Sequence, residues 1–231
     1  MAITTNHPIL PLSIDELLTT TRAVRRRLDL ERPVERSVVE ECLRLAFQAP
    51  TGSNAQNWGW VLIDDPKTRA QVGEIYNEGY RRQRKIFPID GPVQPVNLSG
   101  NHLHKKRVNP LVDVMGNVPV LVVPAFWSRF GGRETTFQQA SHWGSIVPAI
   151  WSFMLALRSR GLGSTWTTVA LHCETELSEL LGIPPQFTPA GLFPVAYTVG
   201  VDFKPADRSF SETRIFWNHW PDEELNSSDA P

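Results

Sequence analysis

An arginine cluster near the start of the chain has the chemistry to bind a phosphate group. Arg22, Arg25, Arg26 and Arg27 fall within six residues of one another. A guanidinium group stays charged at any physiological pH and can grip a phosphate monoester with two parallel hydrogen bonds. A charge cluster is more often a solvated surface segment. The cluster therefore indicates either a phosphate clamp or an exposed charged run.

Residues 50–58, with the sequence PTGSNAQNW, form a loop whose chemistry suits a flat polar ligand. Pro50 ends a preceding helix because its ring lacks an N–H, and Gly52 permits backbone angles that other residues avoid. The side chains of Thr51, Asn54 and Gln56 then offer hydroxyl and amide donors and acceptors. An ordinary surface turn is the alternative interpretation.

Hydroxyl groups recur in residues 164–169, with the sequence STWTTV, which follow Gly161 and Gly163. A plain sheet edge is the alternative there, because threonine favours strands in any context. Further along, residues 203–220 form an aromatic tail that carries basic side chains, Arg208 among them.

Other chemical motifs are weak or absent. His102 and His104 form an HxH pair, but no third metal ligand stands at a recognisable spacing, so we predict no metal site. The chain lacks the GxGxxG, GxxxxGK[ST], HExxH and GxSxG patterns. The sequence therefore gives no support for a dinucleotide-binding fold, a P-loop or a hydrolase.

The overall composition indicates one globular domain. The chain has 231 residues, of which 41% are hydrophobic and 20% are charged, enough to bury a sizeable core. Lys and Arg number 23 against 24 Asp and Glu, and this net charge of -1 favours neither nucleic acid nor an anionic membrane as a partner.

Cys42 and Cys173 lack CxxC partners and are expected to be buried thiols. No apolar stretch approaches the ~20 residues of a membrane span and no signal peptide is recognisable, so we expect a cytoplasmic protein.

Helix caps and hydrophobic periodicity predict helices and strands that alternate along the chain. The predicted helices begin at capping boxes in residues 13–16 and 37–40, the second ending at Ala49, and then cover 65–83, 137–160 and 174–181. The predicted strands are 58–63, 119–123, 164–169 and 193–201. Residues 84–117 lack periodicity, which predicts a lid, a binding loop or an excursion over a partner.

Four of these segments, in this order, resemble the nitroreductase-like family of FMN enzymes. They are the arginine cluster, the P-[ST]-x-x-N-x-Q-x-W loop before a strand, the Gly161-Leu162-Gly163 end of a long apolar helix, and the basic tail at 203–231. The likeness spans nearly the whole chain. It implies an α+β fold with a mixed sheet sandwiched by helices, in a homodimer with two FMN sites at the subunit interface.

The resemblance also implies which residues hold the cofactor. At the FMN phosphate it places Arg22, Arg25, Arg26 and Arg208, and because the RRSxR pattern lacks its serine here, it leaves open which of Arg25 and Arg26 points inward. The loop from the opposite subunit corresponds to Pro50, Thr51, Gly52, Asn54 and Gln56, and Ser145 matches a helix position near the flavin. The strand under the flavin edge corresponds to Thr165, Trp166 and Thr167, where backbone N–H groups or the threonine hydroxyl can stabilise the reduced ring near N5. No catalytic side chain is implied, because a flavin carries the redox chemistry.

The activity that the resemblance implies is NAD(P)H-dependent reduction of a flat small-molecule acceptor, a nitroaromatic or a quinone. Reduced nicotinamide would pass hydride to the flavin and leave before the acceptor binds, a ping-pong exchange through one pocket. The family also contains dehalogenases and flavin-fragmenting enzymes. A non-catalytic flavin-binding or storage protein is the competing class.

Overall fold

The structure is a computed structural model that describes residues 7–86, 109–129, 132–208 and 215–220. Its helices are α1 (Ile14–Thr20), α2 (Arg36–Ala46), α3 (Pro66–Ile86), α4 (Thr136–Ser159) and α5 (Glu174–Leu181), with short 3-10 turns η1 (Gly52–Asn54), η3 (Met115–Asn117) and η4 (Val169–Cys173). Its strands are β1 (Trp58–Ile63), β2 (Val120–Trp127), β3 (Leu162–Ser164), β4 (Phe187–Pro189) and β5 (Phe193–Tyr197).

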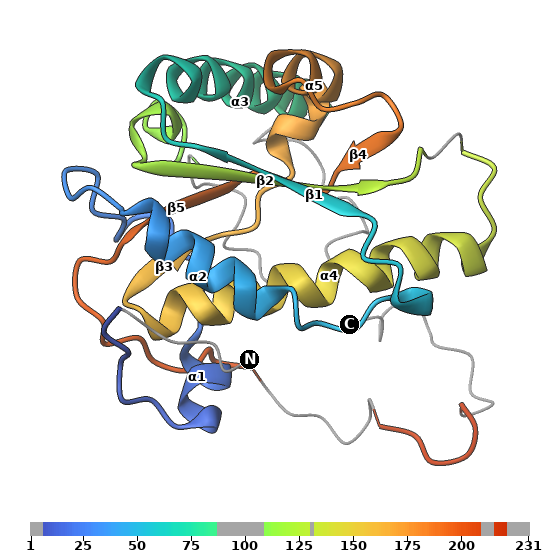
Figure 1. Cartoon of the computed structure of the whole chain (residues 1–231), viewed down its shortest axis with the longest axis horizontal. Coiled ribbons are helices and arrows are strands. Elements are labelled where there is room, and N and C mark those ends of the chain that lie inside the picture. The colour runs from blue at the N-terminus through green and yellow to red at the C-terminus, as the bar shows by residue number, and fades with distance from the viewer. Residues whose placement is uncertain (1–6, 87–108, 130–131, 209–214, 221–231) are drawn as a thin grey trace.

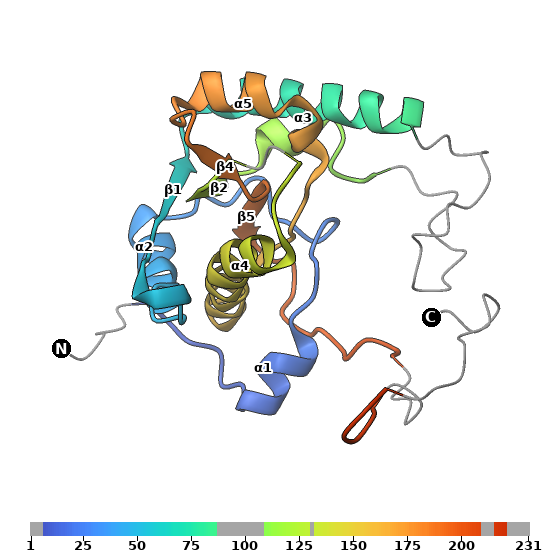
Figure 2. The ribbon, with the colours of Figure 1, turned by 90° about the vertical axis from the view of Figure 1, so that its right-hand side faces the viewer.

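The strands form one sheet between two layers of helices. The order is β1-β2-β5-β3, and β4 also pairs with β2. All pairs between these strands are antiparallel, and the parallel contact in the described ranges is a single bridge from Ala23 to Ser164. Helices α3 and α5 cover one face, and α2 and α4 cover the other (Figure 1, Figure 2). The predicted α+β sandwich is confirmed.

Strand β2 joins two hydrophobic cores because its side chains alternate between the faces of the sheet. Val120 and Val122 pack in the core beneath α2 and α4, and Leu121 and Val123 pack in the core beneath α3 and α5. All four side chains are at most 3% exposed. This central strand was predicted from its apolar run, and it extends four residues further, to Trp127.

Local capping signals start α1, α3 and α4, the last with a capping box at Thr135, whereas α2 starts without a side-chain cap. The Ser13 capping box opens α1, and Asp65 caps α3 by accepting from the Thr68 amide at 2.8 Å. The predicted capping box at 37–40 is wrong, since α2 begins at Arg36 without a side-chain cap. Ser37 lies inside the helix as its second residue, and its hydroxyl contacts His7 Nε2 at 3.0 Å.

Three predicted boundaries are corrected by the structure. Helix α2 ends at Ala46 rather than Ala49, and β5 ends at Tyr197. The predicted strand at 164–169 is wrong, because β3 ends at Ser164 and the chain then turns into η4. By contrast, β1 and α5 have the predicted bounds, and α4 continues through Pro148 to end before Gly161, whose φ is 73°.

The segment predicted as a lid is partly core. Residues 84–86 belong to α3, and Leu111 and Met115 are fully buried against that helix. A Cβ placed on Gly73 would lie 2.7 Å from the Gly116 amide nitrogen, so the two backbones touch. The prediction of a lid therefore concerns residues 87–108, which lie outside the described residues together with His102 and His104.

No helix among the described residues is both long and apolar enough to cross a lipid bilayer.

Candidate functional site

The arginine cluster lies beside the end of β3. Ala23 bridges to Ser164, and the Val24 amide donates to the Ser164 carbonyl at 2.9 Å. A side chain at position 163 would collide with Val24, 3.0 Å from its Cβ, so Gly163 lets the two segments come this close. The fold thus brings the backbone of the arginine segment next to the end of β3, where the hydroxyl-bearing residues begin.

Three buried hydroxyl groups after this junction are without hydrogen-bond partners in the described part of the chain. They belong to Ser164, Thr165 and Thr167, whose side chains are buried. Buried polar atoms in folded proteins are nearly always paired with protein, water or ligand. Three unpaired hydroxyls at the strand end whose backbone pairs with the arginine segment therefore fit a polar ligand.

The Thr167 backbone N–H and C=O are already hydrogen-bonded to Leu192. Its amide donates to the Leu192 carbonyl at 3.1 Å, and the Leu192 amide donates back at 2.8 Å. The predicted donor near flavin N5 was either a backbone N–H or the threonine hydroxyl. At Thr167 the structure leaves the hydroxyl as the available group.

The Trp166 side chain faces the core rather than a ligand. Its indole N–H donates to the Ala190 carbonyl at 2.8 Å, and its ring packs on Phe193 with centroids 5.7 Å apart. A Cβ on Gly191 would lie 2.5 Å from Trp166 Nε1, so only glycine fits there. The Trp166 side chain is half-buried and its indole N–H is already paired.

The loop at 50–56 is exposed and conformationally restrained. Ser53, Asn54 and Gln56 all have positive φ, at 54°, 53° and 47°. Non-glycine residues rarely adopt this region, and its cost is of the order of 1–3 kcal/mol where the fold enforces it. Gln56 Nε2 donates to Asn54 Oδ1 at 2.9 Å, and the Gln56 amide donates to Thr51 Oγ1 at 3.3 Å. Strain of this kind is typical of a binding loop.

Ser145 anchors that loop to α4. Its hydroxyl accepts from the Gly52 amide at 3.0 Å and donates to the Ser141 carbonyl at 2.7 Å. A Cβ on Gly52 would lie 3.3 Å from the Ser145 oxygen, which explains the small residue at this position. Pro50 and the side chains of Asn54 and Gln56 face solvent in the single chain.

Arg25 and Arg26 line one shallow pocket, whose other walls are Leu28, Leu30, Pro110 and Val114. Neither arginine, nor Arg22, forms an ion pair with a described residue. Arg22 is half-buried and the other two are exposed. Both Arg25 and Arg26 remain candidates for the phosphate, because the fold directs both toward the same hollow.

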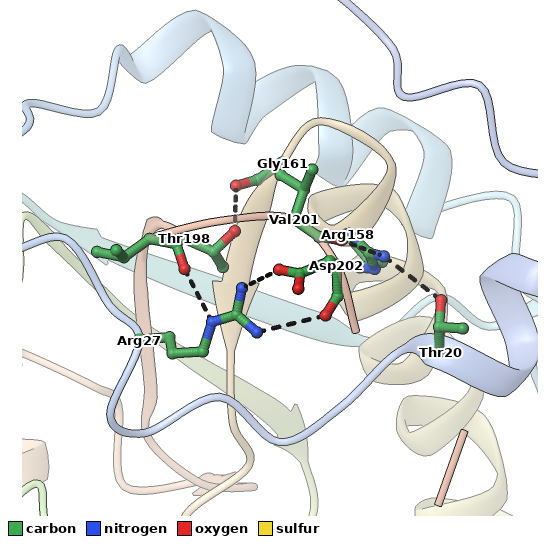
Figure 3. Close-up of polar contacts among 8 residues, drawn as sticks. Thr20, Arg27, Arg158, Gly161, Thr198, Val201 and Asp202 are labelled. Atoms are coloured by element: carbon green, nitrogen blue, oxygen red, sulfur yellow. Dashed lines mark hydrogen bonds and ion pairs between the residues drawn. The ribbon is translucent and has the colours of Figure 1, made fainter. Parts of the chain in front are cut away.

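Arg27 has a different role from its neighbours and fastens the start of the C-terminal tail (Figure 3). Its guanidinium pairs with the Asp202 carboxylate at 2.7 Å and donates to the Val199 carbonyl at 2.8 Å. Arg158 donates to the Val201 carbonyl at 3.0 Å. The Phe203 ring lies 4.3 Å from the Arg27 guanidinium carbon and 5.0 Å from that of Arg158, an arrangement that favours cation–π attraction.

Arg208 follows this anchored segment and is exposed. It forms no hydrogen bond or ion pair with any residue that the structure describes. Its place in a phosphate clamp stays a prediction.

Tyr76 and Asn109 form a polar contact in the core that the sequence did not single out. Tyr76 is 1% exposed, and its hydroxyl accepts from Asn109 Nδ2 at 2.5 Å. Burial raises the pKa of Tyr76, while Asn109, the charge of Arg25 and the Thr167 hydroxyl act in the opposite direction. Nothing in the helical pattern around Tyr76 distinguishes it from a plain core residue.

Metal chemistry has no support in the described ranges, where no three His, Cys, Asp or Glu side chains come together as a metal site. A sheet between two helical layers, with an arginine cluster at one strand end and a polar, strained loop, defines an α+β protein. The chain belongs to the nitroreductase family, whose model matches residues 18–197. The resemblance seen in the sequence is confirmed.

Among curated proteins the chain is similar to iodotyrosine deiodinase 1 of Rattus norvegicus, with 27% identity over 190 residues. The match covers 79% of this chain and 61% of the relative, so the chain spans about three fifths of that protein's length.

Two solved structures share the fold. One is an oxidised iodotyrosine deiodinase bound to FMN and 3-iodo-L-tyrosine, with a TM-score of 0.69 and 19% identity. The other is an FMN and NADPH-dependent nitroreductase from Sphigopyxis sp. strain HMH, with a TM-score of 0.66 and 19% identity. Each match covers 90% of this chain and 100% of the other chain.

Proposed function

We propose that this protein is an FMN-dependent oxidoreductase that takes reducing equivalents from NAD(P)H and reduces a flat aromatic acceptor. The observation that carries the proposal is a group of buried hydroxyls, those of Ser164, Thr165 and Thr167, that lack partners among the described residues. They follow the strand end that pairs with the arginine segment, where Arg22, Arg25 and Arg26 form no ion pair with a described residue. Two members of the fold are described as FMN proteins, which supports the same cofactor here.

The residues of this chain divide between the two ends of the cofactor. Arg22, with Arg25 or Arg26, would hold the terminal phosphate through charge-assisted hydrogen bonds, and Arg208 would join them from the tail. Thr165 and Thr167 would face the ring, where the Thr167 hydroxyl can donate to it. When bound, FMN supplies hydride acceptance and donation, while the protein supplies orientation and charge.

A second subunit would complete the site. The strained loop at 50–56 presents Asn54 and Gln56 to solvent rather than to its own chain. A loop held in a costly conformation has a use only if something binds it, and the exposed face of the loop suits a cofactor held by the partner in a homodimer. The FMN site would then lie at the subunit interface.

The proposal also specifies the reductant and the acceptor. The chain has no dinucleotide motif of its own, so NAD(P)H would use the same face of the site as the acceptor, in turn. The Sphigopyxis nitroreductase is described as NADPH-dependent, which favours NADPH and a nitroaromatic or quinone acceptor.

Reductive dehalogenation is the second candidate. The curated relatives include iodotyrosine deiodinases that are 25–28% identical to this chain, and one solved neighbour holds 3-iodo-L-tyrosine. In that case the acceptor would be an amino acid whose side chain is a halogenated phenol. A flavin-storage role would keep the same phosphate contacts and lack turnover.

Anaerobic acceptor screening tests these alternatives. The purified protein is reduced with NADH or NADPH while flavin absorbance is followed, and then a nitroaromatic, a quinone or an iodotyrosine is added. Reoxidation by the first two supports the proposed activity, and reoxidation by iodotyrosine with iodide release supports the second candidate. A flavin that neither nucleotide bleaches would refute both in favour of storage, and absence of flavin would refute the cofactor itself.

A further inference from the structure

Pro194 lies inside a strand that has neighbours on both sides, which is an unusual position for proline. Strand β5 pairs with β2 along one edge and with β3 along the other. Proline has no N–H to donate to a ladder, so it is normally confined to edge strands, strand starts and bulges. One neighbouring strand must therefore lack a hydrogen-bond donor at this point.

The strand register identifies the carbonyl that loses its donor. Thr167 and Leu192 exchange two backbone hydrogen bonds, at 3.1 and 2.8 Å, in the register that β3 and β5 share. Every second pair of an antiparallel ladder is of this hydrogen-bonding kind. Two residues back along the register, Thr165 lies opposite Pro194. Pro194 therefore cannot supply the N–H that this position of the ladder needs.

Thr165 consequently carries unpaired polar groups at a buried position. Its side chain is 0% exposed, and its hydroxyl has no partner among the described residues. Its backbone also forms no hydrogen bond with another residue in the ranges that the structure describes. Buried polar groups are nearly always paired with protein, water or ligand. A donor from a molecule bound at this strand end would satisfy the Thr165 carbonyl.

A second proline in the same sheet shows how such a carbonyl is used. Pro124 lies in β2, and its carbonyl accepts from the Ala190 amide at 2.8 Å. Because Pro124 has no N–H to return this bond, the Ala190 carbonyl is free, and it accepts from the Trp166 indole at 2.8 Å. A carbonyl opposite a strand proline is therefore within reach of a donor from outside the ladder.

We propose that Pro194 is a positioning residue that reserves the Thr165 carbonyl as a hydrogen-bond acceptor for the cofactor. The donor would be the imide N–H of the flavin ring or a hydroxyl of the ribityl chain. This inference rests on the proposed FMN-dependent function and adds an acceptor to the hydroxyl donors of the site. Any residue with an N–H at position 194 would instead donate to Thr165 and close the ladder.

The test compares the FMN dissociation constants of wild type and Pro194→Ala, measured by flavin fluorescence. The variant should bind FMN about fivefold less tightly, the usual scale of one neutral hydrogen bond, because the amide introduced at position 194 occupies the acceptor. Amide hydrogen exchange of the variant without FMN should show that this amide is protected. The urea midpoint should not fall, because the sheet gains a hydrogen bond.

Pro66→Ala is the matched control. Pro66 begins α3 at an exposed position, where a backbone N–H has no partner within the helix in any case. Both substitutions give the unfolded chain the same additional freedom, so Pro66→Ala reports that effect alone and should bind FMN like wild type.

A flavin analogue distinguishes the two possible donors. If the imide N–H is the donor, N3-methyl-FMN should bind wild type and Pro194→Ala equally. If a ribityl hydroxyl is the donor, this analogue should show the same loss between the two proteins as FMN does. Either result supports an acceptor at Thr165.

The outcomes distinguish this inference from the function beneath it. If wild type holds FMN and turns over while Pro194→Ala binds FMN like Pro66→Ala, the positioning role is overturned and the proposed function stands. An unprotected amide at position 194, or a urea midpoint well below that of Pro66→Ala, would also overturn it and leave Pro194 a structural residue. A wild-type protein that never retains FMN would overturn both.

Discussion

The Gly52 amide donates to the Ser145 hydroxyl at 3.0 Å, and this one contact ties the candidate ligand loop to helix α4. The two residues are 93 positions apart in the chain. Because Ser145 also donates to the Ser141 carbonyl, its oxygen is oriented with a lone pair toward the loop. The loop therefore takes its position from the helix as well as from its own sequence.

Ser145→Ala should weaken FMN retention about fivefold, because a neutral hydrogen bond contributes about 1 kcal/mol and its loss lets the loop move. FMN dissociation constants measured by fluorescence check this. Ser141→Ala is the matched control, since the contact uses the Ser141 carbonyl, which that variant keeps. Equal constants for both variants would show that the loop is held by other contacts.

Arg208→Ala should weaken FMN binding about tenfold or more, because a hydrogen bond to a charged group contributes about 1.5–3 kcal/mol. Arg44→Ala, at an exposed position on α2, is the control and should have no effect. Arg27→Ala should give an intermediate loss, since Arg27 anchors the tail through Asp202 and Val199. An Arg208 variant that binds FMN like the control would remove Arg208 from the clamp.

Thr167→Ala should retain FMN but lower its midpoint potential, because the hydroxyl acts on the ring and not on the phosphate. The hydroxyl is buried and unpaired among the described residues, so its removal costs no existing hydrogen bond. Thr168→Ala, one residue on and exposed, is the control. Spectroelectrochemical titration of both decides, and identical potentials would reassign Thr167 to packing.

Glu41→Gln should lower the free energy of unfolding by about 3–5 kcal/mol, because it leaves a buried guanidinium without its counter-charge. Glu41 Oε1 accepts from Arg160 Nε at 3.0 Å and Nη2 at 2.6 Å, joining α2 to α4. The two side chains are 1% and 4% exposed. Glu40→Gln, on the exposed side of α2, should change urea denaturation very little. A similar midpoint for both variants would contradict a structural role for the pair.

Mixing two inactive variants should restore activity if the site spans two subunits. One variant carries Arg22→Ala with Arg208→Ala, and the other carries Asn54→Ala with Gln56→Ala. Each heterodimer then contains one intact site, so random refolding of a symmetric dimer should recover about one quarter of the wild-type sites. Activity is measured after the two are refolded together and after each is refolded alone. No recovery, or an FMN-loaded monomer by light scattering, would place the whole site in one chain.

The sequence by itself determined the features that rest on neighbouring residues. The Ser13 capping box and the Asp65-Pro66 start act within one turn, and the short apolar, β-branched run at 58–63 favours a strand, so each was predictable. The same holds for α5 and its closing Gly182, which has a φ of 63°. The residue types of the candidate site and their order along the chain were also visible in the sequence, and they were enough to identify the family.

Only the tertiary structure decided the features that depend on partners far along the chain. Ser37 lies inside α2, where its hydroxyl contacts the distant His7, and β3 stops at Ser164 although the Thr167–Leu192 bridge resumes the β3–β5 register after a gap of two residues. In the sequence Arg27 cannot be distinguished from the neighbouring arginines. In the structure it pairs with Asp202, 175 residues further along the chain. Partners this far apart in the chain produce no local periodicity or motif spacing. Such hydrogen bonds and ion pairs therefore cannot be predicted from a pattern in the sequence.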